Sequence, residues 1–262
     1  MTILYFEVLS FTDKLFHGNP AGVCPLDTWI DDDSMKRIAA ENNLSETAFF
    51  VPKDDHYELR WFTPAVEVDL CGHATLATSF VLFEHLGQEG DTIVFHTKSG
   101  ELTVGKDGKF LIMDFPSRPA VPADIPDHMI AGLGRDIEGV FKARDYLVVL
   151  ESEQEVRKLR PNFSELELVD CEGVIVTAPG DEVDFVSRFF APRMGIAEDP
   201  VTGAAHSTLT PYWAERLGKK RLTARQVSKR GGDLWCKLAE DRVQIAGHAV
   251  LYVKGFLDWN EE

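Results

Sequence analysis

The sequence has few basic residues and no long apolar run, and both absences restrict its function. Only 27 of the 262 residues are Lys or Arg, against 43 Asp or Glu, so the net charge is −16. This balance does not fit a protein that binds nucleic acid or an anionic membrane surface, because both need clustered bases. No apolar run reaches the roughly 18 residues that a membrane helix needs. An anionic ligand would have to bind at a site built locally from backbone N–H groups or a few bases.

Cysteine is also scarce, and its positions form no known framework. There is no C-x-x-C pair, no two histidines have zinc-ligand spacing, and nothing resembles the disulfide pattern of a secreted domain. The stretch Met1–Ser10 lacks the basic region and the cleavage site of a signal peptide. We therefore expect a cytoplasmic protein with no metal and no nucleic-acid or membrane partner. The cysteines are Cys24, Cys71, Cys171 and Cys236.

Several common catalytic motifs are missing too. There is no G-x-S-x-G elbow and no Walker sequence, and Gly132-Leu133-Gly134 lacks the third glycine of a dinucleotide-binding motif. What the chain does contain is a globular composition, with 44% apolar and 10% aromatic residues. Its length is enough for one large core or two ordinary ones.

Two segments resemble each other at a distance of 128 residues. Arg60-Trp61-Phe62-Thr63-Pro64 is matched by Arg188-Phe189-Phe190-Ala191-Pro192, and 188 − 60 = 128 is about half the chain. Counting seven residues past each proline pairs Cys71 with Asp199. Small residues typical of a helix start follow in both copies. The duplication predicts two similar halves, each of which points a helix N-terminus and a polar side chain into one shared cleft.

Hydrophobic patterns predict an α+β fold for both halves. Apolar helices are expected at 74–86 and 203–217, and the first has almost no polar face, so it should be buried on all sides. A third helix is expected at 31–42. Each half should then be a curved, mostly antiparallel sheet around one apolar helix. Strands are expected at 3–10, 48–51, 58–63, 92–96, 101–104, 110–115, 146–150, 174–177, 184–190, 226–229, 234–239 and 242–253.

The densest proline run, Pro116–Pro126, is the best candidate for the connection between the halves. This assigns residues 1–115 to the first half and 116–246 to the second. The C-terminal strand 247–256 could complete the first half.

Glu46, in Ser45-Glu46-Thr47, is a candidate acid/base. It lies between a helix end and the apolar run Ala48–Val51. Burial beside apolar neighbours disfavours the ionised carboxylate, so such a side chain can exchange protons near neutrality. The alternative is an ordinary surface glutamate at the entry of a strand.

A second candidate group surrounds Cys71-Gly72-His73-Ala74. A helix N-terminus favours a thiolate at Cys71 and a neutral imidazole at His73. Gly72 allows a ligand to approach the backbone closely. The alternative is a buried cysteine beside a capping histidine.

A third candidate group is Asp199, followed by Gly203 and Ala204. The small residues would expose backbone amides to a carboxylate at the start of the second helix. Asp199 could instead be the N-cap of that helix, although its pairing with Cys71 favours a position in the cleft.

Together these motifs resemble the phenazine-biosynthesis-like (PhzF) family. The resemblance runs from about Ile3 to Val253, with the motifs in the family's order. The motifs are Gly18-Asn19-Pro20 with Val23, Ser45-Glu46-Thr47, Arg60-x-Phe62-Thr63-Pro64 through Glu67, Gly72-His73-Ala74-Thr75, Phe190-x-Pro192 through Glu198-Asp199-Pro200-x-Thr202-Gly203, and Gln226 with Arg230-Gly231-Gly232.

The resemblance implies a diaminopimelate epimerase-like fold with two pseudo-symmetric halves, an active site between them, no cofactor and usually a homodimer. It implies that Glu46 is the proton-transferring acid/base and that His73 and Asp199 help to bind and protonate the substrate. In the family a serine often stands where this chain has Ala204, so a hydroxyl donor is missing there. The related epimerases use one cysteine per half, whereas this chain has Cys71 in the first half only.

The sequence therefore predicts a cofactor-independent isomerase of a small carboxylate. Glu46, His73 and Asp199 are its expected catalytic residues. Two alternatives remain, namely an amino-acid epimerase or racemase that uses Cys71, and a non-catalytic binding protein on the same fold. The expected substrate-binding residues are Asn19, Ser45, Gly72, Ala74, Gly203 and Ala204.

Overall fold

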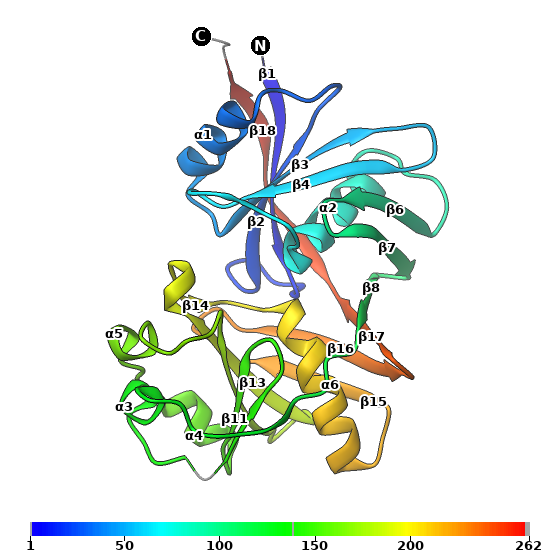
Figure 1. Cartoon of the computed structure of the whole chain (residues 1–262). Helices are drawn as coiled ribbons and strands as arrows, with labels where there is room; N and C mark the ends of the chain where they lie inside the picture. The colour runs from blue at the N-terminus through cyan, green and yellow to red at the C-terminus, as the bar shows by residue number, and fades with distance from the viewer. Residues whose placement is uncertain (1, 138, 260–262) are drawn as a thin grey trace. The chain divides into compact units, whose positions relative to one another are not determined.

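The computed structural model describes residues 2–137 and 139–259, coloured along the chain in Figure 1. The described residues form two compact units. Unit 1 runs up to Asp114 and resumes at Ala246, and unit 2 is Phe115–Ile245. The chain therefore leaves unit 1 along β8 (Phe110–Pro116) and returns to it along β17 (Arg242–Gly247).

Unit 1 is a mixed, mostly antiparallel sheet with two helices. The strands β1–β2, β3–β4, β6–β7 and β1–β18 pair antiparallel, whereas β2–β3 and β4–β6 pair parallel. Figure 1 shows β18 running beside β1. The elements are β1 (Thr2–Ser10), β2 (Asn19–Pro25), α1 (Asp32–Asn42), β3 (Glu46–Pro52), β4 (Tyr57–Phe62), β5 (Glu67–Val68), α2 (Gly72–His85), β6 (Thr92–Thr97), β7 (Gly100–Asp107) and β18 (Ala249–Asp258).

Unit 2 repeats this arrangement with shorter outer strands. The pairs β9–β10, β10–β11, β12–β13 and β15–β16 are antiparallel, and β11–β12 and β13–β15 are parallel. The elements are β9 (Val121–Ala123), α3 (Met129–Leu133), β10 (Val140–Lys142), β11 (Tyr146–Val149), α4 (Glu153–Lys158), α5 (Phe163–Leu166), β12 (Val174–Pro179), β13 (Phe185–Ala191), the 3-10 turn η1 (Pro192–Met194), β14 (Ile196–Asp199), α6 (Gly203–Leu217), β15 (Arg221–Gln226) and β16 (Gly232–Ala239).

One long helix packs on the sheet of each unit, as expected from the apolar periodicity. Helix α2 contacts β1, β2, β3 and β18, and helix α6 contacts β15 and β16. The first eight residues of α2 are all buried, which agrees with its lack of a polar face. Helix α6 has the bounds expected from the sequence, whereas α2 begins two residues earlier, at Gly72.

An arginine–glutamate pair stands at the same place in both units. In unit 1, Arg60 Nε and Nη2 donate to the two carboxylate oxygens of Glu67, over 2.7 and 2.9 Å. In unit 2, Arg188 donates in the same way to Glu198, over 2.7 and 2.9 Å. Two parallel bonds fix both side chains, so this pair is a reliable landmark for aligning the units.

This landmark corrects the expected equivalence of Cys71 and Asp199. The two arginines are 128 residues apart, but their glutamate partners, at 67 and 198, are 131 apart, because the turn η1 lengthens the second loop. The helix N-caps, Cys71 and Thr202, are also 131 apart. Cys71 therefore corresponds to Thr202. Asp199 is not the N-cap of α6, since it ends β14 three residues earlier.

The residue that corresponds to Glu46 is a glycine. Strand pairing matches Thr47–Phe62 in unit 1 with Val174–Phe190 in unit 2, and this places Gly173 at the Glu46 position. A Cβ atom on Gly173 would lie only 2.2 Å from the ring of Phe189. The acidic side chain therefore exists in unit 1 alone.

No helix within residues 2–137 and 139–259 has the length and apolar character of a membrane span.

Candidate functional site

Glu46 is the first residue of β3 and is 9% exposed. It pairs with Ala21 of the parallel neighbour β2, and every residue from Thr47 to Val51 after it is buried. The Glu46 side chain is therefore buried at the start of an apolar strand, as expected. The alternative of an ordinary surface glutamate is wrong.

The start of helix α2 holds Cys71 and His73 beside this carboxylate. Cys71 has an extended backbone, with φ −140° and ψ 108°, and its side chain does not cap the helix. Its carbonyl accepts hydrogen bonds from Thr75, whose Oγ1 lies 2.6 Å away. The carbonyl of His73 accepts from Ser10 Oγ at 2.7 Å, which fixes the first turn of the helix to β1.

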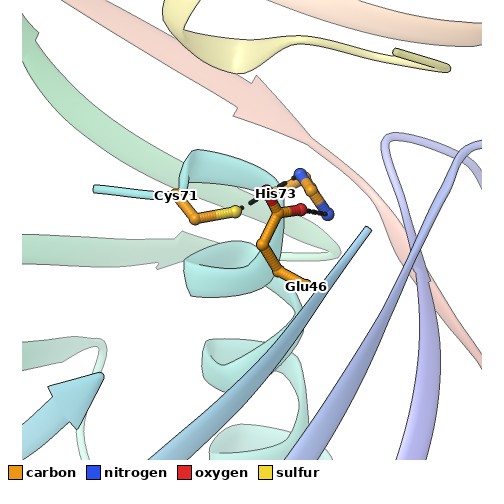
Figure 2. Close-up of side chains that lie close together, drawn as sticks. All are labelled: Glu46, Cys71 and His73. Carbon is orange, nitrogen blue, oxygen red and sulfur yellow. Dashed lines mark hydrogen bonds and ion pairs between the residues drawn. The ribbon is translucent and has the colours of Figure 1, made fainter. Parts of the chain in front are cut away.

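The three side chains converge on one another, as Figure 2 shows. Nε2 of His73 lies 3.2 Å from Oε2 of Glu46, and Nδ1 of His73 lies 3.5 Å from Sγ of Cys71. All three residues are buried, so water screens their interactions only weakly. The imidazole thus faces a thiol on one edge and a carboxyl group on the other.

Burial sets the protonation state of His73. Desolvation lowers the pKa of this imidazole to about 4, and the hydrogen bond to the carbonyl of Pro20 opposes the change only in part. The ring is therefore neutral at physiological pH, with one nitrogen as donor and the other as acceptor. This agrees with the neutral imidazole expected at a helix N-terminus.

The same three residues also form a donor set that a metal ion could use. One ligand atom from each of Glu46, Cys71 and His73 lies within 4.8 Å of the other two. Sulfur, nitrogen and oxygen donors suit Zn²⁺. However, Nε2 of His73 faces Glu46 and Nδ1 faces Cys71. An ion bound to one of these nitrogens could reach the side chain beside the other nitrogen only if that side chain moved. The expectation of a metal-free site stays a prediction.

Most of the binding residues expected in unit 1 lie around this cluster. Ser45 directly precedes Glu46 and is half-buried. Gly72 and Ala74 flank His73 in the first turn of α2, and both are buried. Asn19 begins β2 next to Pro20, the residue that contacts the imidazole, and is fully buried.

Unit 2 holds Asp199 in a second buried network. Oγ1 of Thr202 donates to Oδ2 of Asp199 at 2.5 Å. The amide of Gln226 donates to the Asp199 carbonyl at 2.8 Å and to Thr202 Oγ1 at 3.1 Å, and its Oε1 accepts from the Thr202 backbone N–H at 2.8 Å. Gln226 thus fixes the loop that leads into α6. Gly203 is buried and Ala204 half-buried in the first turn of that helix.

A match to a known family covers nearly the whole chain. Residues 8–255 match the PhzC-PhzF family, described as phenazine biosynthesis-like protein. The chain belongs to this family. An uncharacterized isomerase of Pseudomonas aeruginosa is 51% identical over 257 residues, which cover 98% of this chain and 99% of that protein.

Solved structures confirm the fold class. A PhzF-family protein of Enterococcus faecalis superposes with a TM-score of 0.97 at 47% identity, over 99% of this chain and 100% of that one. A protein described as a predicted epimerase from Pseudomonas aeruginosa gives a TM-score of 0.75 at 19% identity, over 98% of this chain and 100% of its own. The second likeness shows a shared fold, so this PhzF-family chain has the epimerase-like α+β fold.

Gln226 and Thr202 belong to the motifs shared with the family, but the sequence predicts no role for either side chain. Gln226 is fully buried at the end of β15, where an uncharged polar side chain has to find hydrogen-bond partners. That combination of a strand end and an Arg-Gly-Gly turn is the signal that could have identified it. Thr202 was hidden by the incorrect alignment of Asp199 with Cys71.

His206 extends the network of unit 2 and should make the stability of the protein depend on pH. Its Nδ1 lies 2.8 Å from the carbonyl of Thr202, and desolvation lowers the pKa of the ring to about 4. In the unfolded chain a histidine has a pKa near 6.5. Because the folded pKa is the lower one, this contribution to stability is complete above pH 6.5 and is lost as the pH falls from 6.5 towards 4.

Replacement of His206 by Asn should therefore flatten the pH dependence of the free energy of unfolding. We expect the loss between pH 7 and pH 4 to be smaller than in the wild type, by up to about 3 kcal/mol. The measurement is denaturant unfolding at several pH values. His128→Asn is the matched control, because His128 is an exposed histidine of the same unit at φ 69°, a conformation that Asn tolerates. An unchanged slope in His206→Asn would show that this ring takes up its proton as readily in the folded state as in the unfolded chain.

Proposed function

We propose that this PhzF-family protein is an isomerase that relocates a proton on a small carboxylate, with Glu46 as the acid/base. The observation that carries the proposal is the buried contact of 3.2 Å between Glu46 Oε2 and a neutral His73. A neutral imidazole adds no positive charge that would hold the carboxyl group permanently ionised. Glu46 can therefore both take up and return a proton.

The start of helix α2 is the proposed anchor for the substrate carboxylate. Backbone N–H groups at Gly72 and His73 point along the positive end of the helix dipole, and the Cys71 side chain does not cap them. The start of α6, at Gly203 and Ala204, offers a similar set of amides. That both helix starts serve one ligand is still the prediction made from the sequence.

In the proposed reaction Glu46 takes a proton from an activated carbon of the substrate. The protonated Glu46 then returns it at another carbon of the conjugated system, so no net proton is gained or lost. His73 holds a polar group of the substrate or of Glu46 during the transfer. That Asp199 helps in the same reaction is still the prediction made from the sequence. One well-placed acid/base contributes about 10²–10⁴-fold in rate, so the remainder must come from pre-organised donors in a dry site.

An epimerase that uses Cys71 is the second candidate, and the contact between the Cys71 thiol and His73 favours it. Two-base epimerisation with thiols needs a cysteine in each half. The residue that corresponds to Cys71 in unit 2 is Thr202, whose hydroxyl is a far weaker acid than a thiol. The proposed isomerase needs no second thiol and is the better account of the chain. The third candidate, a binding protein, gives no reason for a buried carboxyl beside a neutral imidazole.

The test is a screen of small carboxylates for proton exchange in D₂O, followed by proton NMR. Deuterium at a new carbon together with a shifted double bond would support the isomerase. Deuterium at the α-carbon with inversion would support the epimerase and contradict the proposal. Saturable binding with no exchange for any bound compound would support the binding protein.

A further inference from the structure

The imidazole of His73 is held between two groups that can themselves exchange protons. Sγ of Cys71 lies 3.5 Å from Nδ1, and Oε2 of Glu46 lies 3.2 Å from Nε2, on the opposite edge of the ring (Figure 2). The Pro20 carbonyl also accepts a hydrogen bond from the ring, which favours the tautomer that donates to it, but a carbonyl cannot change its own protonation. Cys71 and Glu46 are therefore the two exchanging partners of the ring.

A neutral imidazole between a thiol and a carboxyl group has two consistent arrangements. In the first, the thiol donates to Nδ1 and Nε2–H faces the Glu46 carboxylate. In the second, Nδ1–H faces a Cys71 thiolate and the Glu46 carboxylic acid donates to Nε2. In both, the cluster carries one negative charge, so the interconversion brings no additional charge into this buried place.

We propose that Cys71, His73 and Glu46 form a proton relay in which one proton moves between the sulfur of Cys71 and the carboxyl group of Glu46, so that Cys71 sets whether Glu46 meets the substrate as a base or as an acid. In one passage the S–H bond breaks and an Nδ1–H bond forms, while the Nε2–H bond breaks and an O–H bond forms on Glu46. The net result is one proton moved from sulfur to oxygen, and the reverse passage restores the thiol. The inference rests on the proposed function of Glu46 and adds how its protonation state is set, because the arrangement with the Cys71 thiol leaves Glu46 as the carboxylate that can take a proton from the substrate.

Three further observations fit this role for Cys71. Its side chain does not cap helix α2, although it occupies the N-cap position. The positive end of the helix stabilises the thiolate that the second arrangement requires. Nε2 of His73 makes no aligned hydrogen bond within the described part of the chain, so the ring edge towards Glu46 can accept or donate after a small rotation of the carboxyl.

Unit 2 lacks each member of the relay. Thr202 replaces the cysteine, Ala204 replaces the histidine and Gly173 replaces the glutamate, as the alignment of helix starts and strands shows. All three positions differ between the units, which fits a joint function in unit 1 better than three unrelated packing roles.

The first test reads the tautomer of His73 directly and needs no substrate. Nitrogen-15 NMR of histidine-labelled protein gives the ratio of the Nδ1–H and Nε2–H forms. We expect Cys71→Ala to change this ratio and Cys71→Ser, which keeps a hydroxyl donor, to restore most of it. Cys24→Ala is the matched control, since Cys24 is a buried thiol of the same unit outside the cluster. The same ratio in wild type and Cys71→Ala would overturn the relay.

The second test asks whether Cys71 acts through His73 in turnover. Cys71→Ala should lower kcat for the carboxylate found in the exchange screen by about tenfold or more at a similar KM, and Cys71→Ser should recover part of the loss. In a His73→Ala background, Cys71→Ala should have no further effect. Equal losses with and without His73 would contradict the relay. If no carboxylate is turned over at all, the proposed isomerase fails, whereas the tautomer measurement still decides whether the proton pathway exists.

Discussion

Replacement of Glu46 by Gln should lower kcat for proton relocation by on the order of 10²–10⁴-fold. Gln keeps the length of the side chain and an oxygen that can accept from His73 Nε2, now 3.2 Å from Oε2. It cannot take up and return a proton at that oxygen. The loss should therefore appear in kcat, with KM and the affinity for a bound carboxylate nearly unchanged.

Binding and folding provide the controls for this variant. Calorimetric titration with the substrate should give a similar Kd, and thermal unfolding should give a similar Tm. Glu41→Gln is the matched charge control, because Glu41 is an exposed glutamate of helix α1 in the same unit. Full activity of Glu46→Gln on a true substrate would show that another group moves the proton.

Glu198→Ala should destabilise the protein by about 3 kcal/mol or more, because it leaves a buried cation without its carboxylate. Arg188 is only 8% exposed. Apart from Glu198, its guanidinium donates to the carbonyls of Val156 and Leu159, at 3.2 and 3.0 Å. Carbonyl groups solvate the guanidinium but do not neutralise it, so the free energy of unfolding should fall steeply.

The matching pair in unit 1 supplies the comparison. Glu67→Ala should cost less, because Arg60 keeps a second carboxylate, Asp32, at 2.9 Å. Arg60 is also the more exposed of the two arginines, with 19% of its side chain accessible against 10% for Arg188. Denaturant unfolding followed by tryptophan fluorescence measures both variants.

A double replacement distinguishes the cost of the unpaired Arg188 charge from the cost of the side-chain packing that is lost. Arg188→Met with Glu198→Leu removes both charges and keeps apolar volume, so it should recover much of the stability lost in Glu198→Ala. Equal costs for Glu198→Ala and Glu67→Ala would contradict the argument from the second carboxylate.

The sequence predicts the helices of this protein better than its loops. The bounds of α6 follow from its apolar residues and the glycine after it, and the buried position of α2 follows from its missing polar face. Glu46 beside an apolar strand pointed to a buried acid, which the structure contains. These predictions hold because periodicity and local propensity act within one element.

The correspondence between distant motifs was less predictable. Cys71 and Asp199 stand at equal distances from their prolines, yet η1 inserts three residues into the second loop. A repeat in sequence places residues correctly only while the loops that follow it have equal length. The contacts between Cys71, His73 and Glu46 were equally invisible, because strand β3 and helix α2 meet only through tertiary packing. Family resemblance named two of these residues but gave no distance between them.

Gly173 has a consequence for how this molecule can evolve. An acid at position 173 would restore the internal symmetry, but its Cβ atom would collide with the Phe189 ring at 2.2 Å. The aromatic side chain would have to become smaller first, at the expense of packing in β13, where its neighbours are buried. An acid at position 173 therefore requires a change at Phe189 as well, and the packing around Phe189 confines the acidic group to unit 1.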